Sequence, residues 1–121
     1  MAKILLVDDE KNILKLYQRD LTDEGYEVTT ADSAAQAMEE LGKKEFDLVV
    51  LDIRMPDEDG ISALEKMMAK KRDLPVILHT AYSNYKDNFL TWLAEDYVIK
   101  SSDMGELKKR IARILKKKGK T

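Results

Sequence analysis

The chain has 121 residues, a length typical of one domain, and 44% of them are hydrophobic, which is enough to build a core. The formal net charge is −2, so no strong overall field attracts nucleic acid, and the absence of cysteine excludes disulfide bonds and thiolate metal sites. No apolar run approaches the roughly 20 residues that span a membrane, and the short N-terminal apolar run ends in two aspartates, unlike a signal peptide. We therefore expect a cytoplasmic protein that contacts neither membranes nor nucleic acid directly.

Strand-like and helix-like patterns alternate through the first half of the chain. Short runs rich in branched apolar residues are typical of strands, and apolar residues three and four positions apart are typical of amphipathic helices. Gly25 stands where the first helix should end, as a C-terminal cap. The predicted elements are, in order, a strand at residues 3–7, a helix at 12–24, a strand at 26–30, a helix that Asp32 or Ser33 caps and that ends near Gly42, and a strand at 48–51.

The same alternation continues through the second half. Pro56 and Gly60 indicate a loop after the third strand, and Leu74-Pro75 ends the connection into the fourth. The remaining predicted elements are a helix that carries Ile61, Leu64, Met67 and Met68, a strand at 76–78, a helix at 84–94, a short strand at 96–99, and a last helix that Asp103 caps and that carries Leu107, Ile111, Ile114 and Leu115.

This order predicts an α/β fold built from five strand–helix units. Strands that alternate with helices form a parallel sheet with helices on both faces, which is a doubly wound sheet. We expect the five strands in the order 2-1-3-4-5, the flavodoxin-like arrangement. We expect residues 1–121 to form a single domain without an output domain, because few residues follow the last predicted helix.

Polar side chains stand where the predicted strands end. Asp8 and Asp9 follow the first strand, Asp52 the third, Thr80 the fourth and Lys100 the fifth. Ligands bind at this edge of an open α/β sheet, and the first and third strands flank its crevice. Close carboxylates repel one another, and a hard divalent cation such as Mg²⁺ removes that penalty. A carboxylate nucleophile, a metal, a hydroxyl and an ammonium group together suit phosphoryl transfer to an aspartate.

Each of these residues alone also has an ordinary structural interpretation. Asp8 and Asp9 can cap the first helix, and Asp52 can be a turn residue before the loop at Pro56. His79, the only histidine, fits a structural role better than catalysis. The basic residues of the last helix are typical of a solvated face near a helix C-terminus, with docking to an acidic partner as the alternative.

Taken together, the motifs resemble those of the receiver domains of two-component response regulators, over essentially the whole chain. The matching stretches are Val7-Asp8-Asp9-Glu10, Asp52-Ile53-Arg54-Met55-Pro56-Asp57-Glu58-Asp59-Gly60, Thr80-Ala81 and Asp96-Tyr97-Val98-Ile99-Lys100. Each is weak alone, but four of them in this order are specific. The family usually has proline after the lysine of the fifth strand, and here Ser101 follows Lys100.

The resemblance implies a role for each site residue. Asp52 would be the phosphoacceptor, and Lys100 would pair with it and then with the phosphoryl group. Thr80 would bind a phosphoryl oxygen, and Tyr97 would be the switch aromatic that turns inward when the threonine moves. The implied ligands of Mg²⁺ are Asp9 directly, Asp8 largely through water, Asp52, and the backbone carbonyl of Arg54.

The expected function is that of a stand-alone receiver rather than an enzyme. It would accept a phosphoryl group from a sensor histidine kinase or a phosphotransfer protein, with Mg²⁺-dependent self-phosphorylation and slow autodephosphorylation as its only chemistry. It would then signal to a downstream protein, as a monomer or a phosphorylation-dependent dimer. The main alternative is a degenerate receiver that acts as an interaction module without phosphorylation. A hydrolase of the aspartyl-phosphate kind would need a second acid two residues after Asp52, where Arg54 stands.

Overall fold

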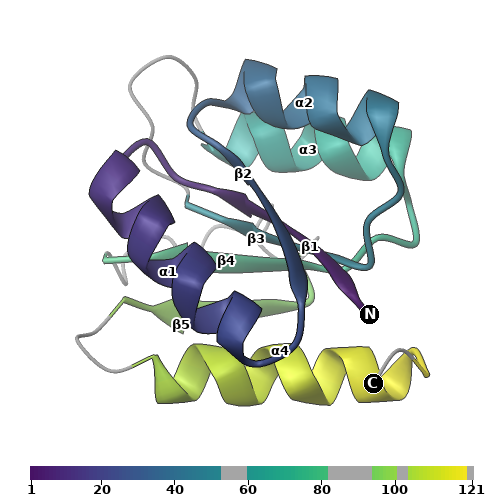
Figure 1. Cartoon of the computed structure of the whole chain (residues 1–121). Helices are drawn as coiled ribbons and strands as arrows, with labels where there is room; N and C mark the ends of the chain where they lie inside the picture. The colour runs from purple at the N-terminus through teal and green to yellow at the C-terminus, as the bar shows by residue number, and fades with distance from the viewer. Residues whose placement is uncertain (53–59, 82–93, 101–103, 120–121) are drawn as a thin grey trace.

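The computed structural model describes residues 1–52, 60–81, 94–100 and 104–119, and these form five strands and four helices. The helix predicted at 84–94 lies outside the described residues except for Ala94, which is in a bend. Figure 1 shows the arrangement of the elements. They are β1 (Lys3–Val7), α1 (Lys11–Asp23), β2 (Glu27–Ala31), α2 (Ala34–Lys43), β3 (Leu48–Leu51), α3 (Gly60–Lys70), β4 (Val76–Thr80), β5 (Asp96–Ile99) and α4 (Gly105–Lys117).

The sheet confirms the predicted topology. All four neighbouring pairs of strands are parallel, and the order is β2-β1-β3-β4-β5. β1 pairs with β3 so that Val7 lies beside Leu51, and β4 pairs with β5 so that Thr80 lies beside Ile99. These registers bring the carboxyl ends of the strands to one edge of the sheet.

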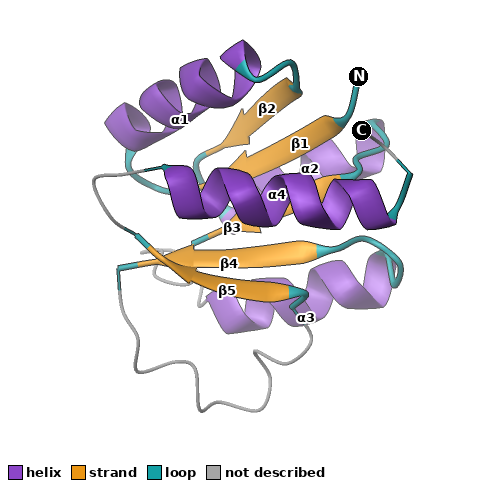
Figure 2. Ribbon diagram, turned by 90° about the horizontal axis from the view of Figure 1, so that it is seen from below, coloured by secondary structure: helices purple, strands orange, loops and turns teal. Residues whose placement is uncertain are grey.

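The helices cover the sheet on both faces, as Figures 1 and 2 show: α2 and α3 lie on one face, and α1 and α4 on the other. The strand side chains alternate between the two faces because successive residues of a strand point in opposite directions. On β1, Leu5 and Val7 join the apolar cluster under α2 and α3, whereas Ile4 and Leu6 join the cluster under α1 and α4. The sheet therefore separates two apolar cores.

The central strands β1, β3 and β4 are mostly apolar because helices cover both of their faces. Every residue of β3 and β4 is buried, and so are four of the five residues of β1. The edge strands β2 and β5 are mostly half-buried, and their sequences mix polar with apolar residues. Within the described residues, no helix is both long enough and apolar enough to cross a membrane.

Local signals in the sequence set several helix ends. The Ser33 hydroxyl accepts a hydrogen bond from the Gln36 backbone N–H at 3.1 Å, which confirms Ser33 as the cap of α2. Gly25, at φ +97°, has the left-handed conformation that follows a helix C-terminus and that glycine adopts without a Cβ clash. Asp32 does not cap α2 with its side chain; its backbone N–H donates to the Gln36 amide oxygen at 2.6 Å.

Several predicted boundaries differ from the structure. α1 begins and ends one residue earlier than predicted, at Lys11 and Asp23, and β2 begins and ends one residue later, at Glu27 and Ala31. β4 extends beyond 76–78 to Thr80, because His79 and Thr80 pair with Val98 and Ile99 of β5. The N-cap residue of α4 is Met104, which makes no capping hydrogen bond with its side chain, and Asp103 lies outside the described residues.

Candidate functional site

Three carboxylates meet where β1 and β3 end. Asp8 and Asp9 follow β1, and Asp52 follows β3. Backbone hydrogen bonds continue the sheet by one residue at this point, because the Asp52 N–H donates to the Val7 carbonyl at 3.0 Å and the Asp8 N–H donates to the Ala31 carbonyl at 3.1 Å. The positions of Asp8 and Asp52 are thus fixed by the ladder of the sheet.

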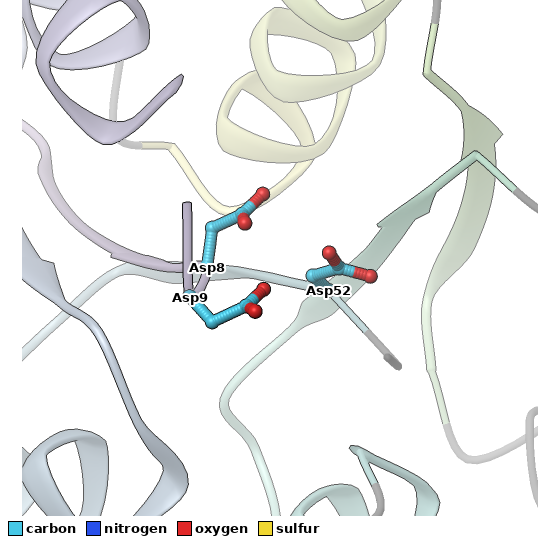
Figure 3. A group of neighbouring side chains, drawn as sticks. All are labelled: Asp8, Asp9 and Asp52. Atoms are coloured by element: carbon cyan, nitrogen blue, oxygen red, sulfur yellow. The ribbon is translucent and has the colours of Figure 1, made fainter. Parts of the chain in front are cut away.

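The three side chains surround one small space, as Figure 3 shows. One carboxylate oxygen from each of Asp8, Asp9 and Asp52 lies within 4.8 Å of the other two. Asp8 is 3% exposed and Asp52 is 5% exposed, while Asp9 is half-buried at the mouth of the site. An all-oxygen set of this kind suits a hard cation such as Mg²⁺, which takes one or two carboxylates and fills its other positions with water or phosphate oxygens.

Lys100 reaches into the same space from the end of β5. Its Nζ donates to Asp8 Oδ2 at 2.6 Å and to Asp52 Oδ2 at 3.0 Å. Burial lowers the pKa of Lys100, but hydrogen bonds and charge attraction from Asp8 and Asp52 outweigh it, so the pKa is raised above its ordinary value. The amine is therefore charged at neutral pH and balances part of the acidic charge.

The end of β4 is tied to Lys100 through the backbone. The Lys100 N–H donates to the Thr80 carbonyl at 2.7 Å, and Thr80 is fully buried. Tyr97 is half-buried on β5, beside Leu78 in the register, and packs against the cluster under α2 and α3. The structure thus places Thr80 and Lys100 on paired strand ends, with Tyr97 three residues before Lys100.

His79 lies beneath this edge rather than in the acidic group. Its ring centroid is 5.4 Å from that of Tyr17 on α1, with the planes tilted by 40°. Burial, and secondly the charge of Lys100, lower the pKa of His79 to about 4, so the imidazole is neutral at pH 7. Burial is also the main cause of the raised pKa of Tyr17.

The helix-cap interpretation of the first two aspartates is wrong for α1. The N-cap residue is Glu10, and no side chain caps the helix there; instead, Asp8 Oδ1 accepts a hydrogen bond from the Glu10 backbone N–H at 3.0 Å. Glu10 has no role in the sequence-based hypothesis, yet its carboxylate lies 3.8 Å from Lys100 Nζ. The signal that could have found it is its place directly after Asp8-Asp9. Arg54, the expected carbonyl ligand, lies outside the described residues.

Comparison with known proteins agrees with this geometry. The sequence model of the response regulator receiver domain family matches residues 4–112. The chain is 41% identical to the response regulator TrrA of Thermotoga maritima, with a TM-score of 0.92 to its structure in complex with Mg²⁺-BeF, and the match covers 95% of this chain and 100% of that one. TrrA has also been solved in complex with the histidine kinase ThkA.

Two further relatives differ in length. A CheY-like receiver domain protein of Methanospirillum hungatei is 29% identical, with a TM-score of 0.93 and with 99% of this chain and 98% of that one covered. The transcriptional regulatory protein PrrA of Mycobacterium tuberculosis is 35% identical over 121 residues, which are 98% of this chain and 52% of that protein. The chain thus spans about half the length of that curated relative.

Proposed function

This chain belongs to the response regulator receiver domain family of two-component systems, and on that premise we propose that it accepts a phosphoryl group on Asp52. The observation that supports this most is the position of Asp52, buried at the end of β3 within hydrogen-bonding distance of Lys100 and grouped with Asp8 and Asp9. We assign it the role of a phosphoacceptor and not that of an enzyme with a separate substrate.

Asp52 suits this role better than its two neighbours. Asp8 is already engaged by the Glu10 N–H and by Lys100 through different oxygens, and Asp9 is less buried. In the proposed step, an Asp52 oxygen attacks the phosphorus of a phosphohistidine or a small acyl phosphate. An O–P bond forms as the bond from phosphorus to the donor breaks, and the electron pair of that bond stays with the donor.

Asp8, Asp9 and Asp52 would hold Mg²⁺, with the Arg54 carbonyl as a further ligand that the family resemblance implies. Their oxygens lie close enough to share one ion, and TrrA is a receiver solved with Mg²⁺-BeF. Bound Mg²⁺ would neutralise carboxylate and phosphoryl charge during transfer. Lys100 also balances part of the charge of Asp8 and Asp52.

Lys100, Thr80 and Tyr97 would convert the modification into a change of surface. A phosphoryl group brings about −1.5 to −2 units of charge and strong acceptor oxygens. Lys100 would stay as its counter-charge, and the Thr80 hydroxyl would donate to a phosphoryl oxygen. Because the Lys100 N–H donates a hydrogen bond to the Thr80 carbonyl, a movement of the backbone at either residue would displace the other. Tyr97 would then change its rotamer on β5 and alter the surface that a partner meets.

The proposed phosphoryl donor is a sensor histidine kinase or a phosphotransfer protein, by analogy with the complex of TrrA with ThkA. We also propose that residues 1–121 act as a single receiver domain in the cytoplasm and signal to a downstream protein, as a monomer or a phosphorylation-dependent dimer. The match to the whole TrrA chain favours this extent, whereas the length of PrrA favours a longer regulator with a second region. An immunoblot of the native cells would decide between these two extents. A band near the 13.9 kDa of this chain would support a single receiver domain, and a much larger band would support a longer regulator.

A degenerate receiver is the second candidate. The observation that favours it is that Lys100 donates hydrogen bonds to both Asp8 and Asp52, so the buried carboxylates have a counter-charge without a phosphoryl group or a metal. Such a protein would bind its partner equally well with and without a phosphoryl donor.

Intact-protein mass spectrometry after incubation with acetyl phosphate separates these functions. We expect one phosphoryl adduct that requires Mg²⁺ and that is absent from Asp52→Asn. The matched control, Asp23→Asn, changes an exposed acid at the end of α1 and should form the adduct normally. If neither acetyl phosphate nor a cognate kinase gives an adduct although calorimetry shows Mg²⁺ binding, the phosphoacceptor function is wrong.

A further inference from the structure

A second hollow lies at the opposite edge of the sheet, where β3 and β4 begin. It has a volume of about 490 Å³ and is lined by residues 44–47 after α2, residues 71–74 before β4, Leu41 and Lys118. Ligand sites for small molecules typically have about 300–1,000 Å³. The groove shares no residue with the acidic site, because β3 separates Asp47 at its start from Asp52 at its end.

The floor of this groove is apolar. Leu41 and Leu74 are buried, and Phe46 is half-buried against the same apolar cluster under α2 and α3. All three residues line the hollow. The groove therefore offers an aromatic ring and two aliphatic side chains to an apolar part of a ligand.

The charged side chains of the rim have a formal net charge of +1, from four cations and three acids. Four cations line the groove (Lys44, Lys71, Arg72 and Lys118) beside three acids (Glu45, Asp47 and Asp73). Lys71 lies 3.6 Å from Glu45, and Lys44 lies 3.8 Å from Glu40 of α2. Lys118 Nζ donates to the Asp47 carbonyl at 3.0 Å, and the Asp47 carboxylate accepts a hydrogen bond from the Lys3 backbone N–H at 2.8 Å. Arg72 is exposed, and among the described residues its guanidinium makes no hydrogen bond or ion pair.

Helix electrostatics favour cations at this rim. α2, α3 and α4 all end at this edge, and each has a lysine in its last turn, where a cation interacts favourably with the helix dipole. Lys44 and Lys118 are the C-cap residues of α2 and α4, Lys71 directly follows α3, and Arg72 comes one residue later, so all four cations stand close to helix C-termini. The helix dipoles do not account for the hollow or for its aromatic floor.

We propose that this groove binds a small phosphorylated organic molecule, with its phosphates beside Lys44, Lys71 and Arg72 and its apolar part over Phe46 and Leu74. Guanidinium and ammonium groups bind phosphate through charge-assisted hydrogen bonds, and the fork of Arg72 can engage two phosphate oxygens at once. Three cations on one rim favour a ligand with several negative charges.

The test is calorimetry of the full chain with ATP as the probe, in EDTA and without Mg²⁺, so that metal at the acidic site plays no part. We expect saturable binding of one ATP per chain. Lys44→Gln/Arg72→Gln should weaken it at least tenfold. The matched control, Arg19→Gln/Lys109→Gln, removes the same charges from exposed positions on α1 and α4 and should leave the affinity unchanged.

Two probes separate the phosphates from the apolar part. Inorganic pyrophosphate and adenosine should each bind more weakly than ATP, because each reaches only one half of the groove. The proposal is wrong if ATP does not saturate the chain, if the control variant weakens binding as much as the groove variant, or if pyrophosphate binds as tightly as ATP. Asp52→Asn should bind ATP normally, so this result is independent of the proposed phosphorylation.

Discussion

Lys100 Nζ lies 3.0 Å from Asp52 Oδ2, and only 11% and 6% of the two side chains are exposed. The same amine lies 2.6 Å from Asp8 Oδ2, so one cation links the ends of β1, β3 and β5. Removing one partner of a buried ion pair leaves the other charges desolvated and unpaired, which is more destabilising than the net value of the pair.

Lys100→Met should therefore lower the free energy of unfolding by about 3 kcal/mol in EDTA, as measured by urea denaturation. The raised pKa of Lys100 means that the stabilisation is fully present below the ordinary lysine value of 10.5 and is lost as the pH rises through the folded-state pKa. Lys109→Met, at an exposed position of α4, should change stability by less than about 0.5 kcal/mol. Equal losses in the two variants would show that the ion pairs of Lys100 add nothing.

Mg²⁺ should stabilise the folded chain through the three carboxylates. A ligand at 100 times its dissociation constant stabilises by about 2.7 kcal/mol, so a rise in Tm with Mg²⁺ concentration reports its affinity. Asp9→Asn should reduce this rise markedly, whereas Asp23→Asn should leave it intact, since Asp9 belongs to the acidic group and Asp23 does not. An unchanged response of Asp9→Asn would remove that residue from the ligand set.

His79 should make stability depend on pH between its two pKa values. The pKa is 6.5 for an ordinary histidine and about 4 in the folded chain, so the unfolded chain binds the proton more readily in this range. Stability should fall as the pH drops from about 6.5 to about 4, by on the order of 3 kcal/mol in total. His79→Gln, compared by urea denaturation over the same range, should lack this component while keeping any contribution from carboxylates. Identical pH profiles for the two proteins would contradict the assignment.

Asp96 should be important for the attachment of α4 to β5. Its carboxylate accepts hydrogen bonds from Arg110 and Arg113, and its Oδ1 also accepts from the Tyr97 backbone N–H at 2.9 Å. Asp96→Asn should cost about 1–2 kcal/mol of unfolding free energy, because charge-assisted hydrogen bonds are weakened. Arg113→Gln should cost less than about 0.5 kcal/mol, since 64% of the Arg113 side chain is exposed. A reversed order of the two losses would argue against this role for Asp96.

Most of the fold could be predicted because its signals are local. The apolar run of β3 gave its bounds without error, the bounds of the mixed polar and apolar β5 were also correct, and Ser33 and Gly25 identified the ends of two helices. The length of β4 was underestimated because His79 and Thr80 are polar, and only their pairing with β5 shows that they belong to the strand. Pairing between distant segments leaves no pattern within the segment itself.

The sequence was enough to predict which residues make up the candidate site, but not the contacts between their side chains. The parallel sheet required Asp8, Asp9, Asp52, Thr80 and Lys100 to share an edge, and the structure places them there. The bridging of two carboxylates by Lys100 depends on side-chain geometry, which sequence spacing does not contain. The same holds for the hydrogen bond from Glu10 to Asp8, and for the groove beside Phe46, which forms only where three helix ends come together.

The separation of the two apolar cores by the sheet has a consequence for evolution. Residues under α2 and α3 do not pack with residues under α1 and α4, so substitutions on one face leave the packing of the other intact. The acidic residues stand at the ends of the strands, outside both cores. Evolution could therefore change the helix surfaces that a partner protein recognises while the acidic residues at the strand ends stay the same.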